Sequence, residues 1–167
     1  MSNEEAAVID SPALTNDFMS KRNKRGTKVI NPNTDKTSFG RIPKNNNGIP
    51  EGEIYLKVGI IGHGPTRTGA FGARHIWEKH KVDLKISQST NVPAIIASIL
   101  EEGVDVLVNF QASHSPARAI VLNTNIGRVA LKQEQDKNGR FSYTIISAYG
   151  NKNAPGTVIG TLESPSN

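Results

Sequence analysis

Cysteine is absent from this chain of 167 residues, which excludes a disulfide, a thiolate nucleophile and a cysteine-based zinc site. Aromatic residues make up only 5% of the sequence, too few to favour a stacking platform for single-stranded nucleic acid. No apolar run approaches the roughly 20 residues of a membrane span. The opening residues, MSNEEAAVID, lack the apolar stretch of a signal peptide, so none is expected there.

Basic residues outnumber acidic residues in this sequence. Lys and Arg number 20 against 15 Asp and Glu, which gives a formal net charge of +5. This excess favours a polyanionic partner, and nucleic acid, an acidic protein and an anionic membrane all satisfy that description. The length suits one compact domain with a tail.

Residues 1–48 differ in composition from the rest of the chain. They hold few large apolar side chains and include the basic run SKRNKRGTK at 20–28. A segment of this kind buries too little apolar surface to offset the entropy lost on ordering. We expect a flexible or loosely docked arm or linker here, whose cations are solvated in preference to binding phosphate. Ordered structure is expected over residues 49–163.

The pattern after residue 48 predicts two helices among a series of strands. Apolar residues at helical spacing and a proline in the first turn mark the second helix. The expected helices are 73–80 and 91–100, and the expected strands are 53–61, 84–87, 104–110, 117–122, 128–135, 140–149 and 157–162. This order predicts an α+β domain with N-terminal helices packed on an antiparallel β-meander.

The turn Asp136–Gly139 predicts the register of the last long hairpin. Asp first and Gly fourth are type I turn preferences, and Gly139 can take the left-handed position of a three-residue loop. The resulting pairs are Glu134 with Ser142, Lys132 with Thr144, Ala130 with Ile146, and Arg128 with Ala148. Two cations and two hydroxyls then share one face, the other face being apolar core. An ordinary solvent face is the alternative.

Two histidines in RHIWEKH are candidates for acid–base chemistry. His75 and His80 are about 140° apart on a helix, so no metal-binding face is predicted. Cleavage of an RNA phosphodiester without metal needs a base, an acid and cations that stabilise the transition state. A histidine beside Arg128 and Lys132 supplies these groups. The alternative is that His75 is an ordinary residue at the helix start with a satisfied imidazole.

A glycine-rich loop, GHGPTRTGAFG at 62–72, precedes the first predicted helix. It has neither the lysine of a P-loop nor the glycine spacing of a dinucleotide fingerprint. It is cationic and opens onto a helix N-terminus, where phosphate is favoured. His63 and Arg67 can move onto a substrate, although a plain connecting loop explains each of them alone. His114, in SHSP, is expected in a turn.

Several short motifs are similar to those of a known nuclease superfamily. They are PEGEIYL at 50–56, GAFGARHI at 69–76, KH at 79–80, GRVALK at 127–132 and FSYTIISAY at 141–149. Over about a hundred residues, the chain resembles the barnase, EndoU, colicin and RelE-like (BECR) superfamily of toxin and phage-associated ribonucleases. The long loop before residue 72 departs from that pattern and leaves the role of the loop open.

The resemblance implies a metal-independent endoribonuclease toxin without a cofactor, as in the C-terminal domains of contact-dependent inhibition proteins. His75 would be the general acid or base, with His80 as a second candidate. The other implied catalytic residues are Arg128 and Lys132, which hold phosphate, and Thr144 and Tyr149, which position the substrate. Arg67, Arg74, Lys79, Ser142 and Ser147 are the expected substrate-binding residues.

The same resemblance implies partners and a location. They are an RNA substrate, foremost tRNA, a cognate immunity protein, and delivery from a producing bacterium into the cytoplasm of a target cell. Two alternatives remain: a non-catalytic nucleic-acid-binding module and a structural module of a phage or secretion system.

Overall fold

The protein is described by a computed structural model over residues 8–111 and 118–166. Its helices are α1 (Asn16–Met19), α2 (Gly72–His80) and α3 (Val92–Ile99), with 3-10 turns η2 (Ser11–Ala13) and η3 (Ser89–Asn91). Its strands are β1 (Val8–Ile9), β2 (Lys28–Val29), β3 (Ser38–Ile42), β4 (Gly52–Tyr55), β5 (Asp105–Val108), β6 (Ala119–Asn123), β7 (Gly127–Gln135), β8 (Phe141–Tyr149) and β9 (Thr157–Thr161). The fold is mixed α and β, with few helices.

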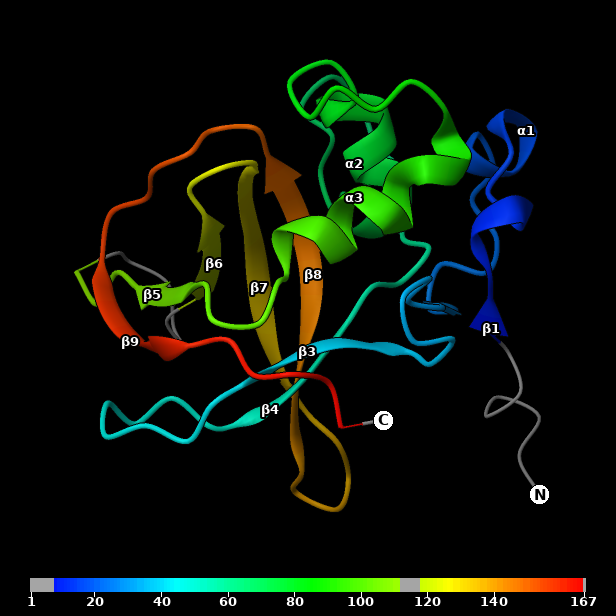
Figure 1. Ribbon diagram of the computed structural model, residues 1–167. Coiled ribbons are helices and arrows are strands. Elements are labelled where there is room, and N and C mark those ends of the chain that lie inside the picture. The colour runs from blue at the N-terminus through cyan, green and yellow to red at the C-terminus, as the bar shows by residue number, and fades with distance from the viewer. Residues whose placement is uncertain (1–7, 112–117, 167) are drawn as a thin grey trace.

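Seven of these strands form one curled sheet, in the order β3-β4-β8-β7-β6-β5-β9 (Figure 1). Strands β5 to β8 follow one another as antiparallel neighbours, and β9 adds antiparallel to the outer side of β5. β4 pairs with β8 in parallel, so the sheet is mixed, whereas a purely antiparallel sheet was expected. The parallel pair arises because β4, from the N-terminal third of the chain, lies beside the C-terminal hairpin.

The curl brings the two outer strands of the sheet together. The amide of Arg41 in β3 donates to the carbonyl of Glu163, just beyond β9, and the amide of Glu163 donates back, both at 3.0 Å. The pairing leaves less unpaired strand edge at this point of the sheet. The Arg41 side chain also binds the carboxylates of Glu51 and Glu53, which fixes the same junction.

The β7–β8 hairpin has the predicted turn and a bulge that the sequence did not predict. Gly139 has φ +81°, and the Asp136 carboxylate accepts from the amides of Asn138 and Arg140, both at 2.9 Å. The predicted pairing is correct as far as Lys132 with Thr144. It is wrong beyond that point, because a bulge between Ala130 and Leu131 shifts the register by one residue. Ala130 then faces Ser147 and Arg128 faces Tyr149.

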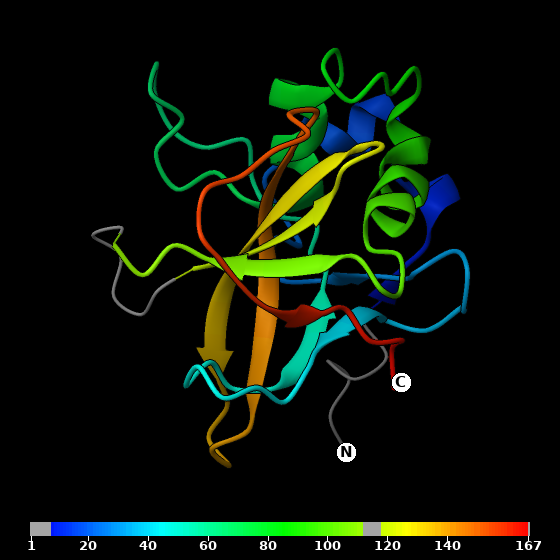
Figure 2. The ribbon, with the colours of Figure 1, turned by 60° about the vertical axis from the view of Figure 1, so that its left-hand side comes forward.

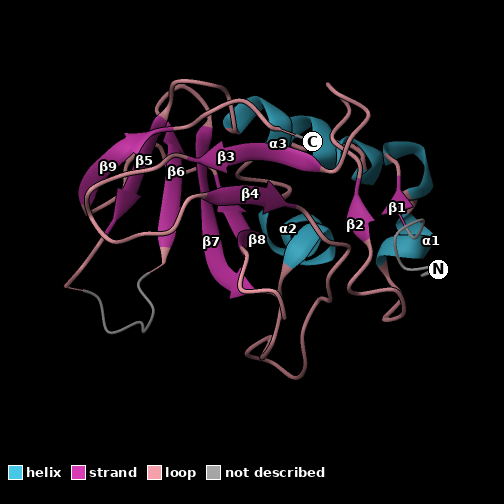
Figure 3. Ribbon diagram, turned by 90° about the horizontal axis from the view of Figure 1, so that it is seen from below, coloured by secondary structure: helices cyan, strands magenta, loops and turns pink. Residues whose placement is uncertain are grey.

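One hydrophobic core includes side chains from the sheet, from α2 and α3 and from the N-terminal segment. Val129, Leu131 and Ile145 from the long hairpin are fully buried, as are Ile76 of α2 and Ile96 of α3. Predicted helices and the strands β5 to β9 are confirmed within one or two residues where the chain is described. Seen from below, α2 lies beside β8 on the side away from β7 (Figure 3).

Residues 8–48 do not form the loosely docked arm that their composition suggested. They carry β1, β2, β3 and α1, and five of their apolar side chains belong to the common core: Leu14, Met19, Val29, Phe39 and Ile42. The physical reason is that these apolar residues are few but all of them are buried in the same core. A composition average hides such contributions.

Two predicted strands differ in the structure. The strand expected over 53–61 ends at Tyr55, because the chain then turns to form single bridges at Lys57 and Ile60. Residues 84–87 form no strand, since the carbonyls of His80 and Lys81 accept from the amides of Leu84 and Ile86 in a compact turn. His114 and the start of the strand expected at 117 lie outside the described residues.

Candidate active site

The candidate site lies on the face of the β7–β8 hairpin opposite the core. We call it the cleft face and define it by these side chains: Arg128, Ala130, Lys132 and Glu134 of β7, and Thr144, Ile146, Ser147 and Tyr149 of β8. The bulge creates this set, because a regular ladder would turn Ser147 and Tyr149 toward the core. Figure 2 shows the 59–71 loop standing out on one side of this hairpin.

Four of the six predicted catalytic residues meet at the upper end of the cleft face. The rings of His75 and His80 lie edge to face, with centroids 5.5 Å apart. The ring of His80 meets Tyr149 in the same manner at 4.7 Å. The guanidinium carbon of Arg128 lies 5.1 Å from the centroid of the Tyr149 ring. We call these four residues the histidine centre.

Asp83 connects the histidine centre to the end of β8. One carboxylate oxygen of Asp83 lies 3.2 Å from Nδ1 of His80, and the other accepts from the amide of Gly150 at 2.7 Å. The contact needs glycine, because a Cβ at residue 150 would lie 2.3 Å from the Asp83 carbonyl oxygen. Asp83 thus orients the His80 ring through Nδ1 and leaves Nε2 for another partner.

The imidazole of His75 is held neutral by its surroundings. Burial lowers the pKa of His75 to about 4, and the nearby charges of His80 and Lys79 act in the same direction. At neutral pH this ring therefore carries a free lone pair and can accept a proton. A depressed pKa from burial beside cationic groups is the kind of perturbation found at functional sites.

Unpartnered polar atoms gather at this same place. Among the described residues, three buried side-chain atoms lack a hydrogen-bond partner: Nδ1 of His75, Nε of Arg128 and Oγ of Ser147. Arg128 and Ser147 are diagonal neighbours on the cleft face, and His75 belongs to the histidine centre. Buried polar groups are almost always satisfied, so a cluster of exceptions calls for a functional explanation or an ordered water.

The other two predicted catalytic residues line a separate hollow lower on the face. Lys132 and Thr144 lie in a cleft of about 310 Å³ whose remaining walls include Lys57, Arg118, Glu134 and the loop residues Gly69, Ala70 and Phe71. Glu134 is its centre. One oxygen of its carboxylate accepts from Thr144 Oγ1 at 2.8 Å and from Lys57 Nζ at 3.1 Å.

The charge state of Glu134 follows from these partners. Burial alone raises the pKa of Glu134, but the Thr144 hydrogen bond and the Lys57 ammonium outweigh it and lower the pKa below its ordinary value, with help from Lys132. Burial and the Lys57 charge lower the pKa of Lys28 close by. The cleft thus holds one carboxylate among several cations, and its balance is positive.

Arg128 and Lys132 do not lie at one phosphate. They are four residues apart on β7, about 13 Å along an extended strand. Arg128 donates to the carbonyl of Asn153 at 2.9 Å and stacks on Tyr149, whereas Lys132 lines the lower cleft. The two cations can therefore contact different phosphates of one strand.

Among the predicted substrate-binding residues, Arg74 is misplaced. Its side chain is fully buried and donates to the carbonyls of Phe18, Asn23 and Gly59, so it holds the N-terminal segment against α2. The sequence did not reveal this, because nothing in RHIWEKH distinguishes a buried arginine from an exposed one and the carbonyl partners of Arg74 lie elsewhere in the chain. Burial lowers the pKa of Arg74.

The other four occupy different places. Ser147 belongs to the cleft face, and Lys79 is exposed at the end of α2 beside the histidine centre. Arg67 pairs with Glu78 of α2 at 3.1 Å and is not among the residues that line the lower cleft. Ser142 lines a different hollow near Arg41 and Arg140.

Sequence reasoning missed Asp83, Glu134 and Lys57 as parts of the site. A signal existed for Asp83, since it follows His80 by three residues. Glu134 appeared only as a pairing partner of Ser142. Lys57 had no local signal, because its contact with Glu134 depends on the parallel pairing of β4 with β8.

Comparison with known proteins adds no assignment to this geometry. No protein-family model matches the chain, and no match is found among curated proteins or solved structures. Within 8–111 and 118–166, no helix is long and apolar enough to cross a membrane. In the same ranges, no three His, Asp or Glu side chains are grouped in a way that could hold a metal ion.

Proposed function

We propose that this chain is a metal-independent ribonuclease whose catalytic residues are those of the histidine centre. The observation that carries the proposal is convergence. Two histidines from α2, a tyrosine from the end of β8 and an arginine from β7 meet at one point, where buried polar atoms lack partners. General acid–base cleavage of RNA needs this set of groups.

The proposed reaction is an internal transesterification. The 2′-oxygen attacks the adjacent phosphorus, the bond from phosphorus to the 5′-oxygen breaks, and a 2′,3′-cyclic phosphate and a free 5′-hydroxyl result. Neutral His75 takes the proton from the 2′-hydroxyl. His80, oriented by Asp83, gives a proton to the leaving 5′-oxygen, and Arg128 stabilises the added negative charge.

The substrate class rests on the positive lower cleft and on the motif resemblance. Lys57, Lys132 and Arg118 offer donors to phosphates that flank the scissile one. The resemblance to BECR toxins extends the proposal to tRNA as the RNA, to a cognate immunity protein, and to delivery into the cytoplasm of a target cell.

A cleavage assay with purified protein tests this proposal. We expect RNA to be cut to cyclic-phosphate products in the presence of EDTA, His75→Ala to lose at least 10²-fold in rate, and Lys36→Ala, an exposed residue outside the site, to keep its rate. Circular dichroism checks that both variants are folded. Full activity of folded His75→Ala, or loss of cleavage on chelation that zinc or magnesium restores, contradicts the mechanism. RNA that is bound but left intact by the wild-type chain supports the non-catalytic alternative.

A further inference from the structure

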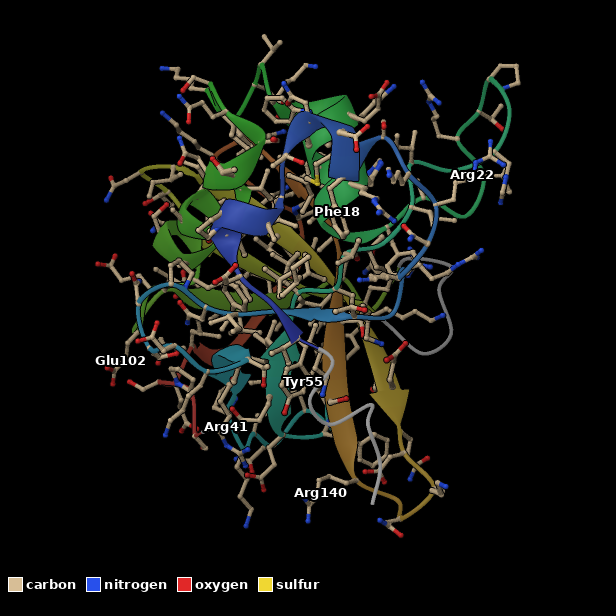
Figure 4. All side chains as sticks on the ribbon, turned by 90° about the vertical axis from the view of Figure 1, so that its right-hand side faces the viewer. Phe18, Arg22, Arg41, Tyr55, Glu102 and Arg140 are labelled. Carbon is tan, nitrogen blue, oxygen red and sulfur yellow. The ribbon has the colours of Figure 1, made fainter. Side chains whose placement is uncertain are left out.

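A second cationic site lies between the N-terminal segment and the 59–71 loop. We call it the cationic pocket and define it by Lys21, Arg22, Arg25, His63 and Arg67. Its volume is about 130 Å³, well below the roughly 300 Å³ at which pockets for drug-sized ligands begin. No carboxylate of the described residues lines it. Figure 4 shows Arg22 beside the projecting loop.

The walls of the pocket are fixed from beneath by Arg74. Its guanidinium donates to the carbonyls of Phe18 at 2.9 Å and Asn23 at 2.5 Å, on either side of Lys21 and Arg22. The amide of Gly59 donates to the carbonyl of Arg25 at 2.8 Å, which ties the segment to the start of the loop. The pocket is therefore built on backbone contacts, with a further buried positive charge below it.

The charges of the pocket are only partly neutralised. Lys21 pairs with Asp17 at 3.4 Å in an exposed contact, and Arg67 pairs with Glu78. Among the described residues, Arg22 and Arg25 have no ion-pair partner. Two free guanidinium groups at a small concave site favour a phosphate, which they can bind through paired donors.

One loop joins this pocket to the proposed catalytic face. Residues 60–63 and Arg67 line the cationic pocket, and Gly69, Ala70 and Phe71 line the lower cleft. Arg67 also bonds to Glu78 on α2, the helix that carries both catalytic histidines. A nucleic acid strand in the cleft can therefore continue along the loop toward the pocket.

We propose that the cationic pocket binds a backbone phosphate of the RNA, away from the scissile one. This inference rests on the proposed function for its ligand. It differs in location, because none of its residues belongs to the histidine centre or the cleft. The pocket adds affinity and positions a long substrate, and it takes no part in proton transfer.

The first test measures RNA binding against salt. His75→Ala protein is used so that the RNA stays intact, and fluorescence anisotropy follows a labelled RNA oligonucleotide. Arg22→Ala/Arg25→Ala should weaken the affinity for RNA on the order of tenfold at low salt. The slope of log K plotted against log salt concentration should decrease in magnitude by about 0.7 for each phosphate that the variant no longer binds. Lys36→Ala/Lys44→Ala removes the same charge from exposed positions elsewhere and should change both quantities much less. Equal slopes for the two double variants overturn the proposal.

A second test separates this proposal from the proposed function. Inorganic pyrophosphate is titrated while NMR follows the ring signals of His63, which should shift in the wild-type chain and not in Arg22→Ala/Arg25→Ala. Such shifts in a protein that cleaves no RNA support the pocket and contradict the catalytic proposal. Cleavage of RNA with no pyrophosphate shift does the reverse. Polyglutamate serves as a probe for an acidic protein partner. If Arg22→Ala/Arg25→Ala loses the polyglutamate binding of the wild-type chain but keeps the same salt dependence of RNA binding, the pocket binds an acidic protein and the phosphate assignment is wrong.

Discussion

His75 is the residue whose environment departs most from that of an ordinary surface histidine. Its ring is partly buried among His80, Lys79 and the end of β8, and its Nδ1 has no partner in the described chain. The protein keeps this ring neutral and leaves it incompletely hydrogen-bonded, which opposes stability. Losses of stability of this kind occur at sites where a side chain is used for chemistry and not for folding.

The depressed pKa of His75 predicts a pH dependence of stability. In the unfolded chain the pKa is near 6.5 and in the folded chain about 4, so below pH 6.5 the unfolded state binds more protons. The free energy of unfolding should therefore fall as pH decreases from 6.5 to 4, by roughly 1–3 kcal/mol after solvent screening is allowed for. Urea unfolding of wild type and His75→Gln across this window measures it. The variant should lack this part of the decrease, and identical pH profiles would contradict the prediction.

Arg128 should affect rate more than binding. Its charge meets the transition state, so Arg128→Ala should lower kcat on the order of 10²-fold with a smaller change in KM, and Arg128→Lys should recover only part of it. Loss of the Asn153 hydrogen bond and the Tyr149 stacking should cost about 1–2 kcal/mol of stability. Single-turnover cleavage and thermal melts measure both effects. Lys132→Ala and Thr144→Ala serve as comparisons lower on the face. Wild-type rates in all three variants would show that the catalytic centre lies elsewhere.

Among the helices, strands and turns, the sequence predicted those that are determined by local residue patterns. The helices expected over 73–80 and 91–100 and the Asp136–Gly139 turn were predicted because helical period, a first-turn proline and turn residues act over a few positions. The bulge at Ile146 was missed, since no residue in that stretch marks it. The bulge determines which residues of β8 reach the site.

The site itself was predictable only in part for the same reason. His75 and His80 were found as candidates because they share one short motif, and Tyr149 and Arg128 because the motif resemblance included them. Their contact with one another depends on how α2 lies against β8, which no local pattern encodes. Arg74 was wrong because burial is a property of the assembled fold.

The 59–71 loop depends on a close approach of two backbone segments at its base. A Cβ at Gly59 would lie 1.8 Å from the carbonyl oxygen of Phe71, and Gly59 has φ +74°. Gly59→Ala should therefore destabilise the protein by about 2–4 kcal/mol and displace the loop. Gly48→Ala, with positive φ but open space, should cost about 1–2 kcal/mol.

Gly26→Ala, with open space and no positive φ, provides the matched control and should stay within about 1 kcal/mol of wild type. Thermal melts of the three variants measure the series. A Gly59→Ala protein as stable as the Gly26→Ala protein would show that the base of the loop is not tightly packed.

Across the whole molecule, residues 8–48 belong to the same hydrophobic core as the proposed nuclease region. Leu14, Phe39 and Ile42 are buried to 1% exposure or less, and β3 forms one border of the large sheet. Arg74 and Arg41 then fasten this segment, Arg74 through hydrogen bonds to backbone carbonyls and Arg41 through ion pairs with Glu51 and Glu53. The segment therefore supports α2, and through α2 the two histidines of the histidine centre, which a linker would not do.

A chain that begins at residue 49 should fail to fold. Removing one large core side chain typically costs 2–5 kcal/mol, and a domain has about 5–15 kcal/mol in total. The truncation removes five such side chains, so we expect no cooperative melting transition by calorimetry and no RNA cleavage. A sharp transition near that of the full chain would restore the linker interpretation.

The parallel pairing of β4 with β8 also constrains how the molecule assembles over time. It joins residues 53–55 to residues 142–144, so one of the central contacts of the sheet closes a loop that spans more than half the chain. Contacts of such long range slow folding, because the chain loses conformational entropy in closing the loop before the contact can stabilise the fold. Helix α2 can form early, but its histidines meet Tyr149 only after the last hairpin has docked. During synthesis, the histidine centre can therefore assemble only after Tyr149 has been added and the β7–β8 hairpin has docked.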